Sequence, residues 1–539
     1  MHIGDFLLHV QGNDSKKRIS LLLFQAVMFA ATAYSDMWLV TGKGYSDRKS
    51  MRQMFFQKVK LLYDFGYECD RLTIVQALLL MTYWYGTLDD QKDAWHWIGL
   101  AVSSAFDLGL HHSAAHSIAD EKRLRLRKRL WWCCVVRDRL LALSMRKPPR
   151  IKNEDFDVPM LGLDDFDFQP LPPALAHVHG EFNSATNPAN RRNLAKLCIE
   201  QARLCVCIGD VLSVQYLAFG EASSSDDEGV VRLKPRGHSR AAGSSQVIEC
   251  DQELEQWRHD LPADCQQRTP RTEDSTEGHD CDHIFVHRLL LFMIYSATVS
   301  ALHRPQVRSD MATDLMAKSL ENVSRQRIKT AAIDVTRSAQ QLEDRNLTRF
   351  LPPIGVAVLM PAIMLHLLES KSNDALVKDV GFDRFYQCQR ILQRLQESYT
   401  SAHVAFSLVE LAKAKVAPET RAESQQGRLH LKSYSTEEKN VPVPLPDICC
   451  AQGTQGSEQE AGEVGETSPQ EQFRHLATPY STSIGAGNEG SQTAIWEFID
   501  NDFDALVNFD AWPRYSQAAT GTFWDVDTGH ISDISHFDT

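Results

Sequence analysis

The chain of 539 residues is long enough for two to four domains at the usual ~100–200 residues per domain. Its hydrophobic fraction of 43% and charged fraction of 24% are close to globular averages, which excludes a wholly disordered, collagenous or multi-span membrane protein. The formal net charge of −13 argues against nucleic-acid binding over the whole surface, because such binding needs a basic excess where phosphates are contacted. Twelve cysteines without a C-x-x-C pair favour a reducing compartment and predict neither a zinc ribbon nor a redox pair.

An apolar run at residues 19–33 follows three cations, Lys16, Lys17 and Arg18, and therefore imitates a secretory signal peptide. Gln25 interrupts the run, and the chain that follows lacks a disulfide pattern. The run is also shorter than the ~20 apolar residues that span a bilayer. We expect a buried helix at this position and no membrane association.

Two segments then place apolar residues three or four positions apart, as in helices with one buried face. These residues are Ile74, Leu78 and Met81 in the first segment and Trp95, Ile98, Val102 and Phe106 in the second. Asp89 and Asp90 are N-cap candidates for the second helix, and Gly109 stands where a left-handed residue ends a helix. A third helix is expected from about residue 120 to 143.

These helices make up the first of two predicted helical blocks, at residues 16–165. Residues 164–190 and 221–245 are rich in Pro, Asn, Ser, Gly and charge, which predicts surface loops, so a loop-rich connection is expected at residues 166–245. A second block is expected at residues 246–415. It includes helices at residues 284–302, 328–342, 354–368 and 382–411. No strand pattern of convincing length is apparent, so the prediction is an all-α, two-block helical bundle.

The C-terminal part has two different compositions. Residues 416–490 hold few large apolar groups, which cannot offset ~1–2 kcal/mol of backbone entropy per residue, so we expect a disordered linker. In the tail at residues 491–539, nine acidic residues, one basic residue and nine aromatics follow from Ile495 onward. Such sequence is typical of transcriptional activation segments, whose solvated rings bind a coactivator groove. The alternative to an activation segment is that these aromatic side chains cluster in a folded domain. The candidate coactivator contacts are Trp496, Phe498, Phe503, Phe509, Trp512, Phe523 and Trp524.

Six cations occur within eight residues near the start of the third expected helix. They are Lys122, Arg123, Arg125, Arg127, Lys128 and Arg129. Such a run is compatible with a nuclear import signal or with a patch that contacts phosphates. The alternative is a helix with a solvated basic face, whose apolar residues such as Leu130 and Trp131 pack inward. We favour the solvated face, which leaves nuclear import open.

No motif in the sequence points to an enzyme or to a bound cofactor. Residues 485–490 match G-x-G-x-x-G, but they lie in low-complexity sequence without the strand and helix that a dinucleotide site needs. His111, His112 and His116 lack an adjacent glutamate base and an obvious further ligand, which disfavours a metal site. The rival interpretation is a helical ligand-binding protein or an enzyme that uses a cavity between the two blocks.

Several short motifs follow one another in a recognisable order. They are residues 93–97 (DAWHW), 107–111 (DLGLH), 129–132 (RLWW), 137–139 (RDR), 146–151 (RKPPRI), 155–159 (DFDVP) and 302–305 (LHRP). Together they resemble the fungal-specific transcription factor domain, the middle homology region of zinc-cluster regulators. The run through residues 159–161 resembles the cutinase transcription factor branch in particular. Within the motifs, Asp138 and Arg139 are expected to pair with the nearby basic segment or to cap backbone groups.

The resemblance implies a nuclear, pathway-specific regulator of metabolic or secondary-metabolite genes. In this hypothesis the helical domain controls activity and the tail recruits coactivators. The family normally opens with a six-cysteine zinc cluster that reads DNA, and this sequence contains no such cluster. Three explanations remain for the missing cluster: the start of the sequence is placed too far downstream, the cluster has been lost, or the helical domain has another role. Zinc and direct DNA contact are expected only if a cluster precedes this sequence, and otherwise a partner contacts DNA. A second copy of the chain is another candidate partner.

Overall fold

The computed structural model of the chain describes residues 3–10, 19–84, 92–113, 120–170, 175, 187–220, 231–236, 241–267, 281–307, 315–372 and 374–416. The predicted linker beyond residue 416 and the acidic-aromatic tail lie outside the described residues, so the expectations for them stay predictions. The described residues up to Glu410 belong to one compact unit, and the last turns of the final helix, from Leu411, belong to a second. Both predicted helical blocks therefore lie within the first unit, apart from those last turns.

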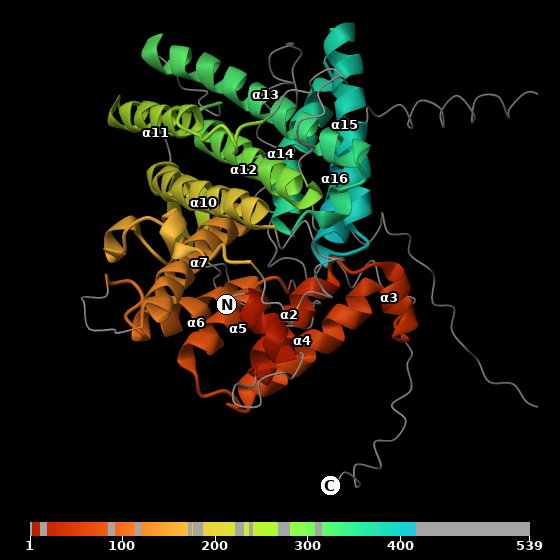
Figure 1. Cartoon of the computed structure of the whole chain (residues 1–539). Helices are drawn as coiled ribbons and strands as arrows, with labels where there is room; N and C mark the ends of the chain where they lie inside the picture. The colour runs from red at the N-terminus through yellow and green to blue at the C-terminus, as the bar shows by residue number, and fades with distance from the viewer. Residues whose placement is uncertain are drawn as a thin grey trace, which may run out of the picture. The chain divides into compact units, whose positions relative to one another are not determined.

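Fourteen α-helices and one β-hairpin account for most of the regular structure in the described residues, which confirms the predicted all-α class (Figure 1). The helices of the first block are α1 (Ile3–Val10), α2 (Leu21–Thr32), α3 (Met37–Gly42), α4 (Arg48–Asp64), α5 (Arg71–Met81), α6 (Ala94–Asp107) and α7 (Glu121–Met145). The later helices are α10 (Pro188–Gln215), α11 (Ala241–His259), α12 (Asp282–Val307), α13 (Leu315–Asp344), α14 (Ile354–Glu369), α15 (Ala375–Leu395) and α16 (Thr400–Val416). Short 3-10 turns are η1 (Asn153–Asp155), η2 (Leu163–Asp165) and η4 (Thr348–Phe350). Strands β1 (Tyr216–Gly220) and β2 (Val231–Pro235) pair antiparallel.

A capping side chain explains where α6 begins, and a left-handed glycine explains where it ends. Asp93 precedes α6 and accepts the backbone N–H of His96 at 2.8 Å. The expectation that Asp89 or Asp90 caps this helix is wrong, because a cap must directly precede the first helical residue. Gly109, just after α6, has φ of +62°, as predicted for a left-handed C-terminal residue.

Tryptophans anchor the core of the first block. Trp97 of α6 and Trp131 of α7 are fully buried. The ring centroid of Trp97 lies 5.9 Å from that of Phe56 on α4, and the centroid of Trp131 lies 5.5 Å from that of Phe106. Removing one such ring from a core typically costs about 3–5 kcal/mol. The tryptophan-rich motifs of the sequence therefore serve packing between α4, α6 and α7.

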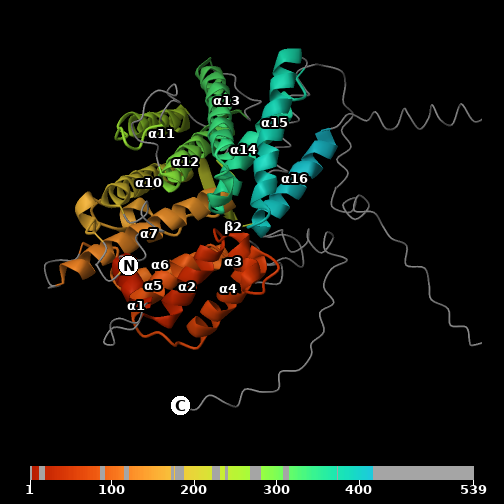
Figure 2. The ribbon, with the colours of Figure 1, turned by 45° about the vertical axis from the view of Figure 1, so that its right-hand side comes forward.

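Helix α12 is long and apolar enough to cross a membrane, but 89% of its apolar window is buried inside the structure. It packs against α10, α11, α13 and α14, and the two views show these helices gathered around it (Figures 1 and 2). This burial is that of a core helix. The apolar run at residues 19–33 similarly forms α2, in which Leu22, Ala26 and Phe29 are buried, as expected.

Helix α10 lies inside residues 166–245, where the sequence predicts a loop-rich connection. Asn187 caps it by accepting the N–H of Ala189 at 2.9 Å, and Pro188 occupies its first turn, so a start signal is readable in the sequence. The helix contacts α7 on one side and α12 on the other. It is therefore a packed bridge between the two blocks. The hairpin that follows α10 is also absent from the prediction, which contains no strand.

The helix expected at residues 382–411 is two helices, α15 and α16, separated at residues 396–399. Distant segments hold this break in place. Arg52 Nη1 donates to the carbonyl of Ser398 at 3.0 Å, and Tyr399 Oη donates to the carbonyl of Leu351 at 2.9 Å. Because both partners are far away in the sequence, local apolar spacing does not reveal the break.

Candidate functional site

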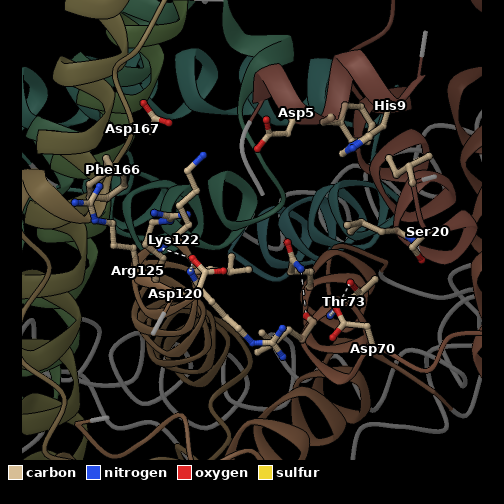
Figure 3. Close-up of a pocket in the computed structure, with 18 of the residues that line it drawn as sticks. Asp5, His9, Ser20, Asp70, Thr73, Asp120, Lys122, Arg125, Phe166 and Asp167 are labelled. Atoms are coloured by element: carbon tan, nitrogen blue, oxygen red, sulfur yellow. Dashed lines mark hydrogen bonds between the residues drawn. The ribbon is translucent and has the colours of Figure 1, made fainter. Parts of the chain in front are cut away.

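A cavity of about 510 Å³ lies in the first block. Its walls come from α1, the starts of α2 and α5, the first half of α7 and residues 166–169 after η2. Figure 3 shows side chains of α1, α5 and α7 around this space. The volume is within the ~300–1,000 Å³ of small-molecule sites. The cavity does not lie between the two helical blocks, where the rival interpretation expects one.

Three helices begin at the cavity, and the residue before each of them lines it. Ser20 precedes α2, Asp70 precedes α5 and Asp120 precedes α7. Each side chain accepts a backbone N–H of the first turn: that of Leu23 at 3.3 Å, of Thr73 at 3.2 Å and of Lys122 at 3.0 Å. The N-terminus of a helix carries about half a positive charge, and the carboxylates of Asp70 and Asp120 offset it at two of these three starts.

The basic run of the sequence divides between the cavity and helix packing. Four of its six cations line the cavity, namely Lys122, Arg123, Arg125 and Arg129. The other two contact the surrounding protein. Arg127 Nη2 donates to the carbonyl of Leu108 at 2.8 Å, and Lys128 Nζ pairs with the carboxylate of Asp165 at 2.7 Å. The run is therefore not one continuous solvated face.

The four cations at the cavity differ in how far they are engaged. Lys122 and Arg123 are exposed, and neither side chain forms a hydrogen bond or ion pair with any residue that the structure describes. Arg125 pairs with Glu121 at 2.5 Å. Arg129 donates to the backbone carbonyl of residue 165, and burial lowers the pKa of its guanidinium. Two donors at the start of α7 thus remain available to a solute.

Apolar side chains complete the walls. They are Phe6, Ile19, Leu23, Leu72, Leu126, Phe166 and Phe168. Phe6 of α1 stacks on Phe24 of α2 with ring centroids 6.4 Å apart. Arg191 of α10 donates to the carbonyl of Gln169 at 2.7 Å, which fixes the loop after η2. The cavity therefore has a charged end and apolar sides, and contacts with neighbouring helices hold α1 and the loop after η2 in place.

The motif around residues 137–151 forms a buried polar network. Asp138 is fully buried and accepts the backbone N–H groups of Arg150 at 3.0 Å and Ile151 at 3.1 Å. Its carboxylate also pairs with Arg139 Nη1 at 3.1 Å. Burial raises the pKa of Asp138, and these contacts oppose the rise. The backbone capping agrees with the expectation from the sequence, whereas the ion pair joins Asp138 to Arg139 itself and not to the nearby basic segment. These contacts join the end of α7 to the segment after it.

The second block contains a chain of contacts that resembles a catalytic triad. His303 Nδ1 lies 3.0 Å from Ser324 Oγ, and His303 Nε2 lies 3.2 Å from Asp251 Oδ1. Arg327 Nη2 also pairs with this carboxylate, at 2.5 Å. Burial opposes ionisation of Asp251, but the hydrogen bonds from His303 and Arg327 outweigh it and lower the pKa. Because Ser324 is 0% exposed and His303 is 1% exposed, a solute cannot reach the hydroxyl, and the cluster joins α11, α12 and α13.

The cations of the cavity form a run that is visible in the sequence, whereas the helix starts opposite them come from distant parts of the chain. Ser20 and Asp70 each precede a helix, which is a readable N-cap signal, yet nothing local shows that these starts meet Asp120. The candidate coactivator contacts from Trp496 to Trp524 lie outside the described residues, as does His116. Among the described residues, no group of three or more His, Cys, Asp or Glu side chains could hold a metal ion.

The chain is similar to a known domain family and to several fungal transcription factors. Residues 2–259 match the profile of the Fungal specific transcription factor domain, and this match ends where α11 ends. Cutinase transcription factor 1 beta of Fusarium vanettenii is 40% identical over 453 residues, which are 83% of this chain and 51% of the relative. Transcription factor cpaR of Aspergillus oryzae is 30% identical over 398 residues, 73% of this chain and 64% of the relative. The acetamidase regulatory protein of Aspergillus oryzae is 24% identical over 444 residues, 82% of this chain and 49% of the relative.

An all-α unit with these motifs is thus a domain of the kind found in fungal transcription factors. The match of residues 2–259 to this domain, together with the similarity to named fungal transcription factors, confirms the resemblance seen in the motifs. It spans about half the length of the cutinase and acetamidase regulators that it matches. No solved structure matches the chain.

Proposed function

We propose that this chain is the regulatory and activating part of a nuclear, pathway-specific transcription regulator that acts on metabolic or secondary-metabolite genes. The observation that carries the proposal is its 40% identity, over 83% of its length, to a protein named as a transcription factor. The similarity to regulators named for cutinase and acetamidase supports control of a metabolic pathway. The helical unit then serves as the control module.

Activation is assigned to the tail at residues 491–539. Its nine acids and nine aromatics from Ile495 onward support contact with coactivators, since acidic repulsion keeps the rings available to a partner. The test fuses the full chain to a foreign DNA-binding module in a reporter strain. Replacing Trp496, Phe503 and Trp512 by Ala should abolish most of the output. Replacing Ser516, Gln517 and Thr520 by Ala is the matched control and should leave it unchanged. Equal output from both variants would contradict this role.

DNA contact is assigned to a zinc cluster that precedes this sequence or to a DNA-binding partner. The six-cysteine pattern does not occur in these 539 residues, and the net charge of −13 does not favour phosphate contact. A gel-shift experiment with the purified chain should therefore show no sequence-specific complex at physiological salt. A specific complex that resists competitor DNA would overturn this assignment.

The second candidate function, a ligand-binding protein, is favoured by one observation. The cavity in the first block has the volume and mixed lining of a small-molecule site. The two candidate functions are compatible, because a transcription regulator can be controlled by a ligand that it binds.

A further inference from the structure

Charged side chains of both signs line the cavity. Four aspartates and four Lys or Arg residues line it, so their formal charges cancel. The starts of α2, α5 and α7 add about half a positive charge each. The carboxylates of Asp70 and Asp120 are already engaged by the backbone N–H groups that they cap. These carboxylates offset the partial positive charge of the helix starts that they cap, so an anion would be held by the cations without a partner among the described residues, Lys122 and Arg123.

Donors for an anionic head group lie at the start of α7. Lys122 and Arg123 occupy its first turn, are exposed, and make no side-chain hydrogen bond or ion pair within the described ranges. Figure 3 shows Lys122 and Arg125 near Asp120, at the same end of the space. An ammonium and a guanidinium next to a helix N-terminus suit a compact oxyanion such as a carboxylate or a phosphate.

The remaining walls suit an apolar body. Leu23 and Leu72 are buried side chains that face the cavity, and Leu126 continues the same surface along α7. Phe166 and Phe168 close another side on the loop that Arg191 holds. A ligand that lacks an apolar part would leave these walls wet, so inorganic phosphate alone uses only part of the site.

We propose that this cavity binds a small organic anion, with a carboxylate or phosphate head group at the start of α7 and an apolar body against the leucine and phenylalanine walls. The role of this cavity as the effector site of a transcription regulator rests on the proposed function. Binding of an anion in the cavity is argued separately, from the residues that line it.

The test uses the purified full chain and the fluorescent probe anilinonaphthalene sulfonate, which joins an apolar body to one anionic group. Its uncharged parent, phenylnaphthylamine, is the matched probe. The double variant Lys122→Gln/Arg123→Gln should weaken binding of the sulfonate about tenfold or more, as expected for lost charge-assisted hydrogen bonds, and leave the neutral probe unchanged. The control Lys378→Gln removes an exposed cation on α15 and should change neither. Unchanged sulfonate binding in the double variant, or an equal loss of both probes, would overturn the proposal.

A second variant tests the apolar part. Gln76→Trp places a large ring in the cavity from α5 and should reduce binding of both probes, while Tm shows that the fold persists. Naphthyl phosphate and naphthoate then compete with the sulfonate probe, and the stronger competitor identifies the head group. Displacement by neither compound overturns the assignment of an anion site. These measurements need no transcription, so their failure is distinct from failure of the reporter experiment.

Discussion

The guanidinium of Arg139 on α7 lies so close to Gly209 on α10 that a Cβ at residue 209 would stand 2.7 Å from Arg139 Nε. Arg139 is 1% exposed and cannot move aside, because its Nη2 donates to Asn153 Oδ1 at 3.0 Å. Asn153 in turn donates to Asp210 Oδ1 at 2.8 Å. A glycine on α10 therefore makes room for the buried polar network that extends from α7.

Gly209→Ala should destabilise the protein, although alanine usually stabilises a helix relative to glycine. The added methyl group collides with a buried side chain, and overpacking of this kind costs about 1–3 kcal/mol. Urea unfolding measures the change. Gly42→Ala on α3 is the matched control, because no atom lies within 4 Å of a Cβ there. It should be neutral or stabilise by up to ~1 kcal/mol. A neutral Gly209→Ala variant would show that Arg139 has more freedom than the structure gives it.

Asp138 should respond in a graded way to substitution. Asp138→Leu leaves the charge of Arg139 buried without its partner and should cost about 3–5 kcal/mol of unfolding free energy. Asp138→Asn keeps an oxygen that accepts a backbone N–H and should cost about 1–3 kcal/mol. Asp379→Asn, on an exposed position of α15, is the control and should stay within about 0.5 kcal/mol. A leucine variant as stable as the asparagine variant would contradict this role.

The stability contributed by Asp251 should depend on pH. Its contacts with His303 and Arg327 lower its pKa below the ordinary value of about 3.9. Its contribution is thus complete above pH ~4 and is lost as the pH falls through the folded-state pKa. Asp251→Asn should cost about 1–3 kcal/mol at pH 6 and progressively less below pH ~4. Thermal unfolding of both proteins between pH 2.5 and 7 checks this. A difference in Tm that stays constant with pH would refute it.

Nuclear entry should survive loss of the cations at the cavity. Arg125 pairs with Glu121, and Lys122 and Arg123 are held in the first turn of α7 instead of in an extended peptide. A fluorescent fusion of the full chain with Lys122→Gln, Arg123→Gln and Arg125→Gln should keep the nuclear-to-cytoplasmic ratio of the unaltered chain. A shift to the cytoplasm, absent with Lys378→Gln, would instead identify the run as an import signal.

Local patterns predict much of the first block. Apolar spacing locates α5 and α6, Gly109 ends α6 as expected, and the third helix runs from Asp120 as its cap. These features depend on neighbours within one or two helical turns, so they are visible along the chain. The break between α15 and α16 depends on Arg52, more than 300 residues away, and no local pattern contains it.

By itself, the sequence determined the all-α class, the separate composition of the C-terminal part and the motifs of a fungal transcription factor family. Periodicity and composition carry these properties, because each residue contributes to them without reference to distant ones. The tertiary structure alone decided that Ser20, Asp70 and Asp120 meet at one cavity and that the basic run divides between this cavity and packing. Residues far apart in the chain come together when their helices pack, and that packing depends on side-chain contacts between the helices.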